Sequence, residues 1–98
     1  MTINETKNGN ELIISPEGRL DTTTAPELEE KVKGSIDGVT DLVFDLAGLE
    51  YISSAGLRVL LSTQKIMEKQ GKMKFINVSD IIMEIFDVTG FSEILTIE

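Results

Sequence analysis

Two adjacent serines, Ser53 and Ser54, have the best prospects for chemistry in this chain. They stand where a short apolar run, 41–46, gives way to leucines at helical spacing, a pattern that predicts a strand, a turn and then a helix. Serine is a preferred N-cap, so we expect Ser53 at the cap and Ser54 in the first helical turn. Free backbone N–H groups and the helix dipole would stabilise an anion there, including a phosphate carried by Ser54.

The competing interpretation is that both serines only cap the helix, which is the commoner role of serine at such a position. Ala55 and Gly56 follow them and are small, so the Ser54 hydroxyl would be reachable by the active site of another protein. The residue pattern alone leaves both interpretations open.

Missing residue types exclude several kinds of enzyme. The chain has no cysteine and no histidine, which excludes a disulfide framework, a Ser-His-Asp hydrolase and a typical zinc enzyme. The glycines do not form a phosphate-binding loop ending in Gly-Lys-Ser or Gly-Lys-Thr. We therefore expect a protein that is not an enzyme and that binds no metal ion. Five carboxylates lack metal-site spacing and are expected to be solvated: Asp37, Asp41, Asp45, Glu50 and Asp80.

The charge balance limits the partners. With 17 acidic and 9 basic residues, the formal net charge is −8, which argues against binding the phosphate backbone of a nucleic acid. A basic or mixed-charge protein surface is the expected partner. Residues 1–6 lack the features of a signal peptide, and no apolar stretch is long enough to cross a bilayer. We expect a cytoplasmic protein without membrane contact.

The N-terminal part reads as a β-hairpin. Residues 2–6 and 11–15 are strand-like and flank an Asn-Gly turn within 7–10. The second strand should resume at 18–20 after Pro16, which we place at a bulge or on an edge strand because proline cannot donate to a ladder. The exposed edge of this hairpin could pair with another chain, so the oligomeric state stays open.

Helices and strands alternate in the remainder of the chain. A first helix over 25–36 buries Leu28, Val32 and Ile36 and leaves its lysines in water. The other predicted elements are a strand at 40–46, a helix at 54–70, a parallel strand at 73–78, a short helix over 81–88 and a last strand at 94–97.

The predicted order is β-β-α-β-α-β-α-β, which corresponds to an α/β fold. It should form a small mixed sheet with its helices mainly on one face. No repeat or linker divides the sequence, so residues 1–98 are expected to form a single domain.

Three segments resemble a known family. Residues 46–57 resemble the signature of STAS domains, in particular the small anti-sigma factor antagonists of bacteria. The segment 18–21 is similar to the first loop of that family, and 86–91 resembles its last helix and turn. The three matches occur in the family's order and span nearly the whole chain.

The resemblance implies a phosphorylation switch. In this family the unphosphorylated antagonist binds an anti-sigma factor that is also a serine kinase of GHKL type, and so releases a sigma factor. Phosphorylation of the signature serine breaks the complex, and a phosphatase restores it. The kinase supplies ATP and magnesium, so the antagonist needs no cofactor.

Alignment on the signature places the phosphoacceptor at Ser54. The family often has aspartate just before it, where this chain has Ser53, a second-choice acceptor. The resemblance and the predicted turn together suggest a contact surface of Asp21, Thr22, Thr23, Ser53, Ser54, Gly56, Leu57 and Arg58. Asp21 could instead be only a turn or cap residue, and Arg58 could neutralise Glu50 or a bound phosphate.

A second class of function stays open beside this one. The chain could be a STAS adaptor subunit in a transport or sensory complex, with Ser54 never modified. Stable association with transporter or sensor subunits would distinguish that role from association with a kinase.

Overall fold

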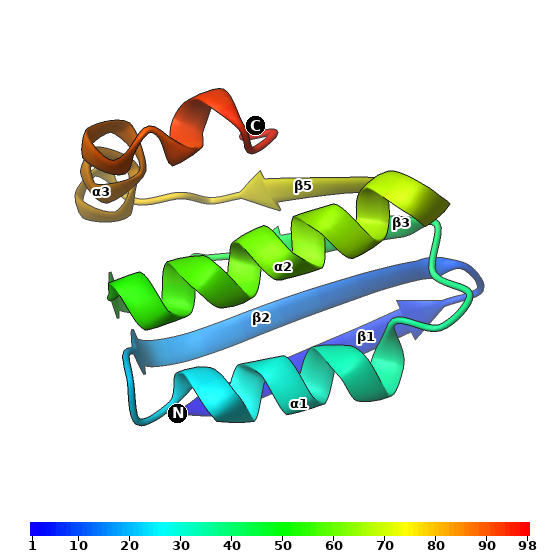
Figure 1. Cartoon of the computed structure of the whole chain (residues 1–98). Helices are drawn as coiled ribbons and strands as arrows, with labels where there is room; N and C mark the ends of the chain where they lie inside the picture. Colours follow the sequence, from blue (N-terminus) through cyan, green and yellow to red (C-terminus); the bar gives the residue numbers. More distant parts are fainter.

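The computed structural model describes residues 1–98 and has the predicted α/β architecture, a mixed sheet with helices (Figure 1). The helices α1 and α2 lie side by side over one face of the sheet, and α3 lies near the end of β5. The elements in chain order are β1 (Thr2–Asn8), β2 (Glu11–Leu20), α1 (Ala25–Ser35), β3 (Asp41–Asp45), β4 (Leu49–Ile52), α2 (Ser54–Gln70), β5 (Lys72–Ile76), α3 (Asp80–Thr89) and the 3₁₀ turn η1 (Phe91–Glu93).

The sheet has the order β1-β2-β3-β5, with β4 also paired to β2. The predicted opening hairpin is confirmed, because β1 runs antiparallel to β2 with Asn8 opposite Glu11. The pairs β2–β3 and β3–β5 are parallel, as expected from the crossover helices between them. β2 has two parallel partners in succession, β3 along 11–14 and β4 along 18–20. β2 therefore joins the part of the sheet that contains β3 and β5 to the short strand β4.

One cluster of 22 buried apolar residues lies mainly between this sheet and the helices. The predicted stripe of α1 is confirmed: Leu28 is fully buried, and Val32 and Ile36 nearly so. Phe75 stacks on Phe44 with their ring centroids 5.2 Å apart, and it meets the edge of Phe86 at 5.8 Å. These aromatic contacts attach α3 to the sheet, and burial of the three rings stabilises that attachment.

The strand β4 was not predicted. Leu49 and Ile52 are buried while Glu50 is exposed and Tyr51 half-buried, so the segment lacks the apolar alternation that marks a strand. It is only four residues long, and its sequence alone predicts no more than a turn before α2. Its pairing with β2 decides where that helix begins.

The expectation for Pro16 was also wrong. It lies opposite Ile3 in the regular antiparallel register and belongs to β2, which is an interior strand. The irregularity in β2 falls instead between Gly18 and Arg19. Pro16 stands where β2 has left β3 and has not yet reached β4. That gap in the parallel ladder suits a residue that has no N–H to donate.

The C-terminal part differs from the prediction in two respects. Residues 94–97 form no strand; a single parallel bridge joins Ile97 to Phe75. Ile94 still has the helical conformation in which η1 ends, with φ −96° and ψ −38°, so the predicted strand cannot begin there. β5 ends at Ile76 rather than at 78, because Asn77 has a positive φ of 55° that breaks the extended conformation.

Candidate functional site

Ser54 is exposed and is the first residue of α2. Ser53 occupies the N-cap position with extended backbone, as expected. Its N–H donates to the carbonyl of Leu20 at 2.8 Å, and its own carbonyl accepts from Leu57 at 2.9 Å. The start of α2 is therefore held at the C-terminal end of β2, and Ser54 lies on the surface at that end.

The Ser53 side chain does not make the predicted cap bond. Its Oγ atom is buried and has no hydrogen-bond partner. The first turn of α2 also contains no acidic residue. Its free N–H groups and the positive end of the dipole therefore stay available for a negative charge on Ser54.

The turn from β2 to α1 is built on the carboxylate of Asp21. Its Oδ1 atom accepts hydrogen bonds from the N–H groups of Thr23 at 3.0 Å and Thr24 at 3.2 Å. The Thr24 hydroxyl donates to the carbonyl of Arg19 at 2.8 Å, which closes the turn. The interpretation of Asp21 as a turn residue is confirmed, whereas its contact with a partner stays a prediction.

These hydrogen bonds lower the pKa of Asp21. The largest cause is the backbone N–H of Thr24; the N–H of Thr23, the Thr24 hydroxyl and the charge of Arg19 act in the same direction, and desolvation opposes them. A carboxylate that accepts backbone hydrogen bonds is favoured in its charged form. Asp21 therefore supplies a negative charge to the loop that contains the exposed Thr22 and Thr23.

Arg19 lies beside the Asp21 turn and was not predicted as a site residue. Its guanidinium carbon lies 4.4 Å from the centroid of the Tyr51 ring, and its Nε atom lies 4.0 Å from Asp21 Oδ2. Arg19 and Tyr51 are register partners in β2 and β4. Only the pairing of β4 brings them together, so no local signal in the sequence could have identified the contact.

Gly56 and Leu57 belong to the core more than to the surface. Both are buried, and Leu57 is only 5% exposed. A Cβ atom on Gly56 would lie 2.7 Å from Leu20 Cγ and 2.8 Å from Ile52 Cγ1. Gly56 therefore lets α2 approach β2 and β4, Leu57 packs in the core, and little of either remains for a partner.

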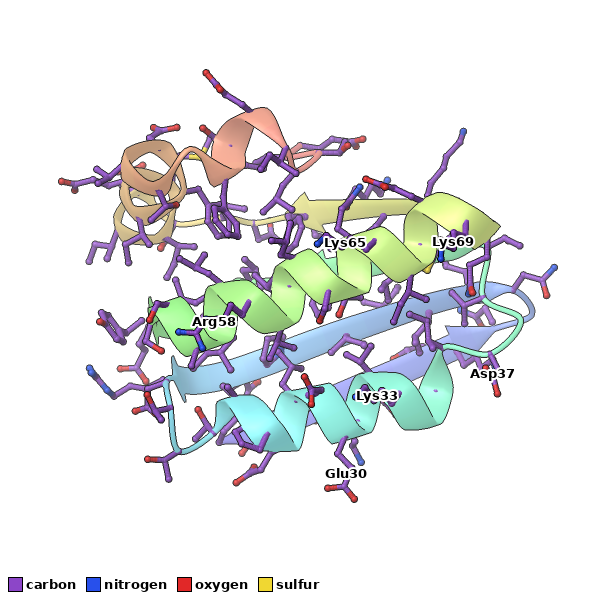
Figure 2. The ribbon with its side chains drawn as sticks, viewed as in Figure 1. Glu30, Lys33, Asp37, Arg58, Lys65 and Lys69 are labelled. Carbon is purple, nitrogen blue, oxygen red and sulfur yellow. The ribbon has the colours of Figure 1, made fainter.

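Arg58 is exposed one turn after Ser54 (Figure 2). The suggested ion pair with Glu50 is absent, because none of the three ion pairs of the structure involves Arg58. Arg58 instead lines a groove of about 500 Å³ between α1 and α2. Thr22 and Ala55 line the same groove, which therefore begins beside Ser54.

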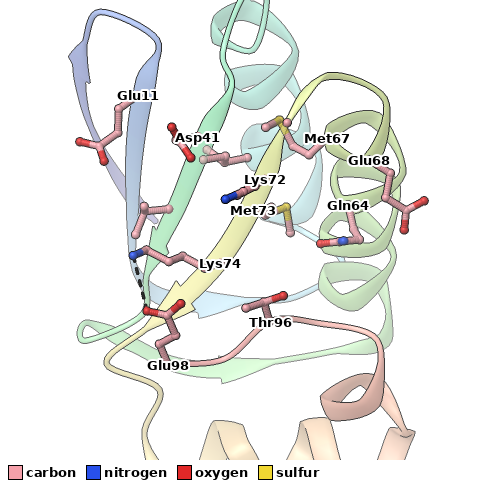
Figure 3. A pocket seen from close by; sticks show the side chains of 13 residues that line it. Glu11, Asp41, Gln64, Met67, Glu68, Lys72, Met73, Lys74, Thr96 and Glu98 are labelled. Carbon is pink, nitrogen blue, oxygen red and sulfur yellow. Dashed lines mark ion pairs between the residues drawn. The ribbon is translucent and has the colours of Figure 1, made fainter.

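Another hollow, of about 480 Å³, lies at the opposite end of α2 along β5 (Figure 3). Lys72 and Lys74 lie on one side of it and Gln64 on the other, with an ion pair of 3.5 Å between Lys74 and Glu98. None of the predicted site residues lines it. No group of three acidic side chains could hold a metal ion, and no helix is long and apolar enough to span a membrane.

Comparisons with known proteins identify the family of this chain. The family model of the STAS domain matches residues 2–98. The anti-sigma-B factor antagonist of Bacillus subtilis is 34% identical over 92 residues, which cover 93% of this chain and 84% of that protein. The putative anti-sigma factor antagonist BtrV of Bordetella bronchiseptica is also 34% identical, over 88% of this chain and 76% of the relative.

Solved structures share the fold at lower identity. An anti-sigma factor antagonist from Mycobacterium paratuberculosis superposes with a TM-score of 0.89 at 24% identity, over 98% of this chain and 83% of that one. SpoIIAA in its unphosphorylated form gives a TM-score of 0.78 at 18% identity, over 99% and 87% of the two chains. This chain belongs to the STAS domain family.

Proposed function

We propose that this chain is an anti-sigma factor antagonist controlled by phosphorylation of Ser54. The unphosphorylated form binds an anti-sigma factor that is also a serine kinase of GHKL type and so releases a sigma factor in the cytoplasm. The kinase then uses ATP and magnesium to phosphorylate Ser54 and end the complex, and a serine phosphatase reverses that step. The protein acts by binding and is not itself an enzyme.

The observation that carries this proposal is the contrast between the two serines. Ser54 is exposed at the first position of α2, whereas the Oγ atom of Ser53 is buried. A kinase can reach the first and not the second. The names of the two relatives, an anti-sigma-B factor antagonist and a putative anti-sigma factor antagonist, support the same role.

A phosphate at this position acts locally. It adds a charge of about −1.5 to −2 at a helix start that tolerates an anion, so the domain stays folded. The same charge on a docking surface opposes a partner by repulsion and by the cost of removing its water. The proposed partner-binding surface comprises Ser54 with Asp21, Thr22, Thr23, Arg58 and the backbone at Ser53.

The test uses the Ser54→Ala variant as bait in the source cells. The protein that it retains is purified and mixed with the wild-type chain, ATP and Mg²⁺. We expect a phosphate on Ser54 by peptide mass spectrometry, loss of the complex on phosphorylation, and about 10-fold or greater weakening by Ser54→Asp. Asn8→Asp adds the same charge at the distant hairpin and should bind like wild type.

Two results would overturn the proposal. One is a retained protein that is a transporter or sensor subunit without kinase activity, which would identify the chain as an adaptor. The other is equal affinity of the wild type, Ser54→Ala and Ser54→Asp for the purified kinase.

A further inference from the structure

The groove between α1 and α2 has a composition that differs from the rest of the molecule. Its base includes the buried Ala25 and Val59 and the half-buried Leu61. Its charged side chains are Arg58 and Lys65 on α2 and Glu29 on α1, and it begins beside Ser54. An apolar base with charged sides is suited to a protein segment that carries both kinds of side chain.

The cations of the groove are not neutralised by the protein itself. Glu29 is the one acidic side chain of the lining, and its Oε1 atom already lies 3.5 Å from Lys33 Nζ. Arg58 and Lys65 take part in no ion pair. They are two helical turns apart on α2 and thus share a face of that helix. Figure 2 shows them along α2, with Lys69 further toward its end.

The pair of cations in the groove contrasts with the acidic charge of the chain as a whole. The chain has a net charge of −8, and the part that follows Lys74 has no basic residue. That part contributes five carboxylates: Asp80, Glu84, Asp87, Glu93 and Glu98. An acidic segment is repelled by the net charge of the molecule and attracted where two unpaired cations lie on one helix face, as Arg58 and Lys65 do, which would fix its orientation.

We propose that this groove receives an acidic segment of the anti-sigma factor, an inference that rests on the function proposed above. Carboxylates of the segment pair with Arg58 and Lys65, and an apolar side chain lies against Val59 and Leu61. A nucleic acid does not fit, because the net charge of the chain opposes a phosphate backbone. A second copy is disfavoured because each copy carries the same charge of −8.

This contact also explains how a phosphate on Ser54 would end the complex. Ser54 and Arg58 are four residues apart on α2 and are neighbours on its surface. A phosphate there attracts the Arg58 guanidinium, which is the cation that the acidic segment needs. The phosphate therefore competes with the acidic segment for Arg58, and it also repels that segment.

The test is the affinity of the purified anti-sigma factor for charge-reversed variants. Arg58→Glu combined with Lys65→Glu should weaken binding about 10- to 100-fold. Lys7→Glu combined with Lys31→Glu makes the same charge change at two exposed cations that have no ion pair and lie outside the groove. This control should bind within a few-fold of wild type.

Two further measurements separate charge from shape. Wild-type affinity should fall between about 0.05 M and about 0.5 M salt, and the groove variant should lose most of that dependence. Ser62→Trp fills the groove without a change in charge and should also weaken binding, whereas Thr6→Trp on the exposed edge strand should not.

Several outcomes would overturn the inference. Equal affinity of the groove variant and wild type would show that the groove is not a binding site, while the Ser54 switch could still operate. If the groove variant and the control double variant weaken binding equally, the loss of affinity is due to the change in net charge and not to the groove. If the wild type self-associates and the groove variant does not, a second copy of the chain is the occupant of the groove. If no anti-sigma factor binds any variant, the proposed function itself fails, and this inference fails with it.

Discussion

The Cγ atom of Leu20 lies 2.7 Å from the position that a Cβ atom would occupy on Gly56. This close approach holds the start of α2 against the end of β2, where Ser53 is bound to the Leu20 carbonyl. Leu20 is fully buried and Ile52 nearly so, and both surround Gly56. The position of Ser54 therefore depends on Gly56, which lies two residues later and has no side chain.

Replacing Gly56 tests this dependence. We expect Gly56→Ala to lower the free energy of unfolding by about 1–3 kcal/mol, because two buried side chains must shift to admit the methyl group. Gly34→Ala is the matched control, since Gly34 is exposed in α1 and its Cβ would meet no atom within 4 Å. That variant should gain about 0.5–1 kcal/mol in helix stability. Urea unfolding measures both, and equal effects of the two substitutions would contradict the packing argument.

The two serine N-caps should respond differently to alanine. Ser79 caps α3 by accepting a hydrogen bond from the N–H of Ile82 at 3.3 Å, whereas the Ser53 hydroxyl has no partner. Ser79→Ala should therefore cost about 1 kcal/mol. Ser53→Ala should stay within about 0.5 kcal/mol of wild type, because it removes a buried polar group that was not hydrogen-bonded. Thermal unfolding of both variants checks the difference; a larger loss from Ser53→Ala would mean that its hydroxyl does cap α2.

The attachment of α3 should depend on Phe86. This ring is fully buried and meets the Phe75 ring edge to face. Phe86→Ala should lower stability by about 3–5 kcal/mol through lost burial and the cavity left behind. Val88→Ala on the same helix is the control, because Val88 is 80% exposed and the change should stay within about 0.5 kcal/mol. A similar unfolding midpoint for both variants would show that α3 adds little to the core.

The turn at Asp21 should make stability depend on pH. Since folding lowers the pKa of Asp21, its stabilising effect is fully present above the ordinary aspartate pKa of about 4. That effect disappears as the pH falls through the lower pKa of the folded state. Asp21→Asn should therefore be less stable than wild type at neutral pH, and the difference should shrink in acid.

Unfolding at several pH values between neutrality and strong acid measures this difference. Asp37→Asn removes an exposed carboxylate outside the turn and controls for the loss of one negative charge. A constant difference between wild type and Asp21→Asn across the range would show that the turn does not depend on the carboxylate charge.

Much of the fold could be predicted because its signals are local. The opening hairpin, whose turn lies at Gly9-Asn10 rather than at the predicted Asn8-Gly9, the α1 stripe of Leu28 and Val32, and the Ser53 cap position each depend on residues close together in the chain. Turn preference and helical periodicity act within such short segments. The same kind of signal placed Ser54 at the start of a helix.

Other features depend on residues far apart in the chain. The four residues of β4 have no strand pattern of their own and become a strand only by pairing with β2. That pairing brings Arg19 over Tyr51 and places Leu20 against Gly56. The Pro16 prediction failed for the same reason, since its place between two strand partners is set by the whole sheet.

The sequence by itself thus determined the order of most elements, the serine pair at the helix start and the family signature. Only the tertiary structure decided which serine is exposed, which predicted contact residues are buried, and that Arg58 and Lys65 line one groove with α1. The physical reason is that exposure and charge pairing depend on what packs against a residue, and here those neighbours come from distant parts of the chain.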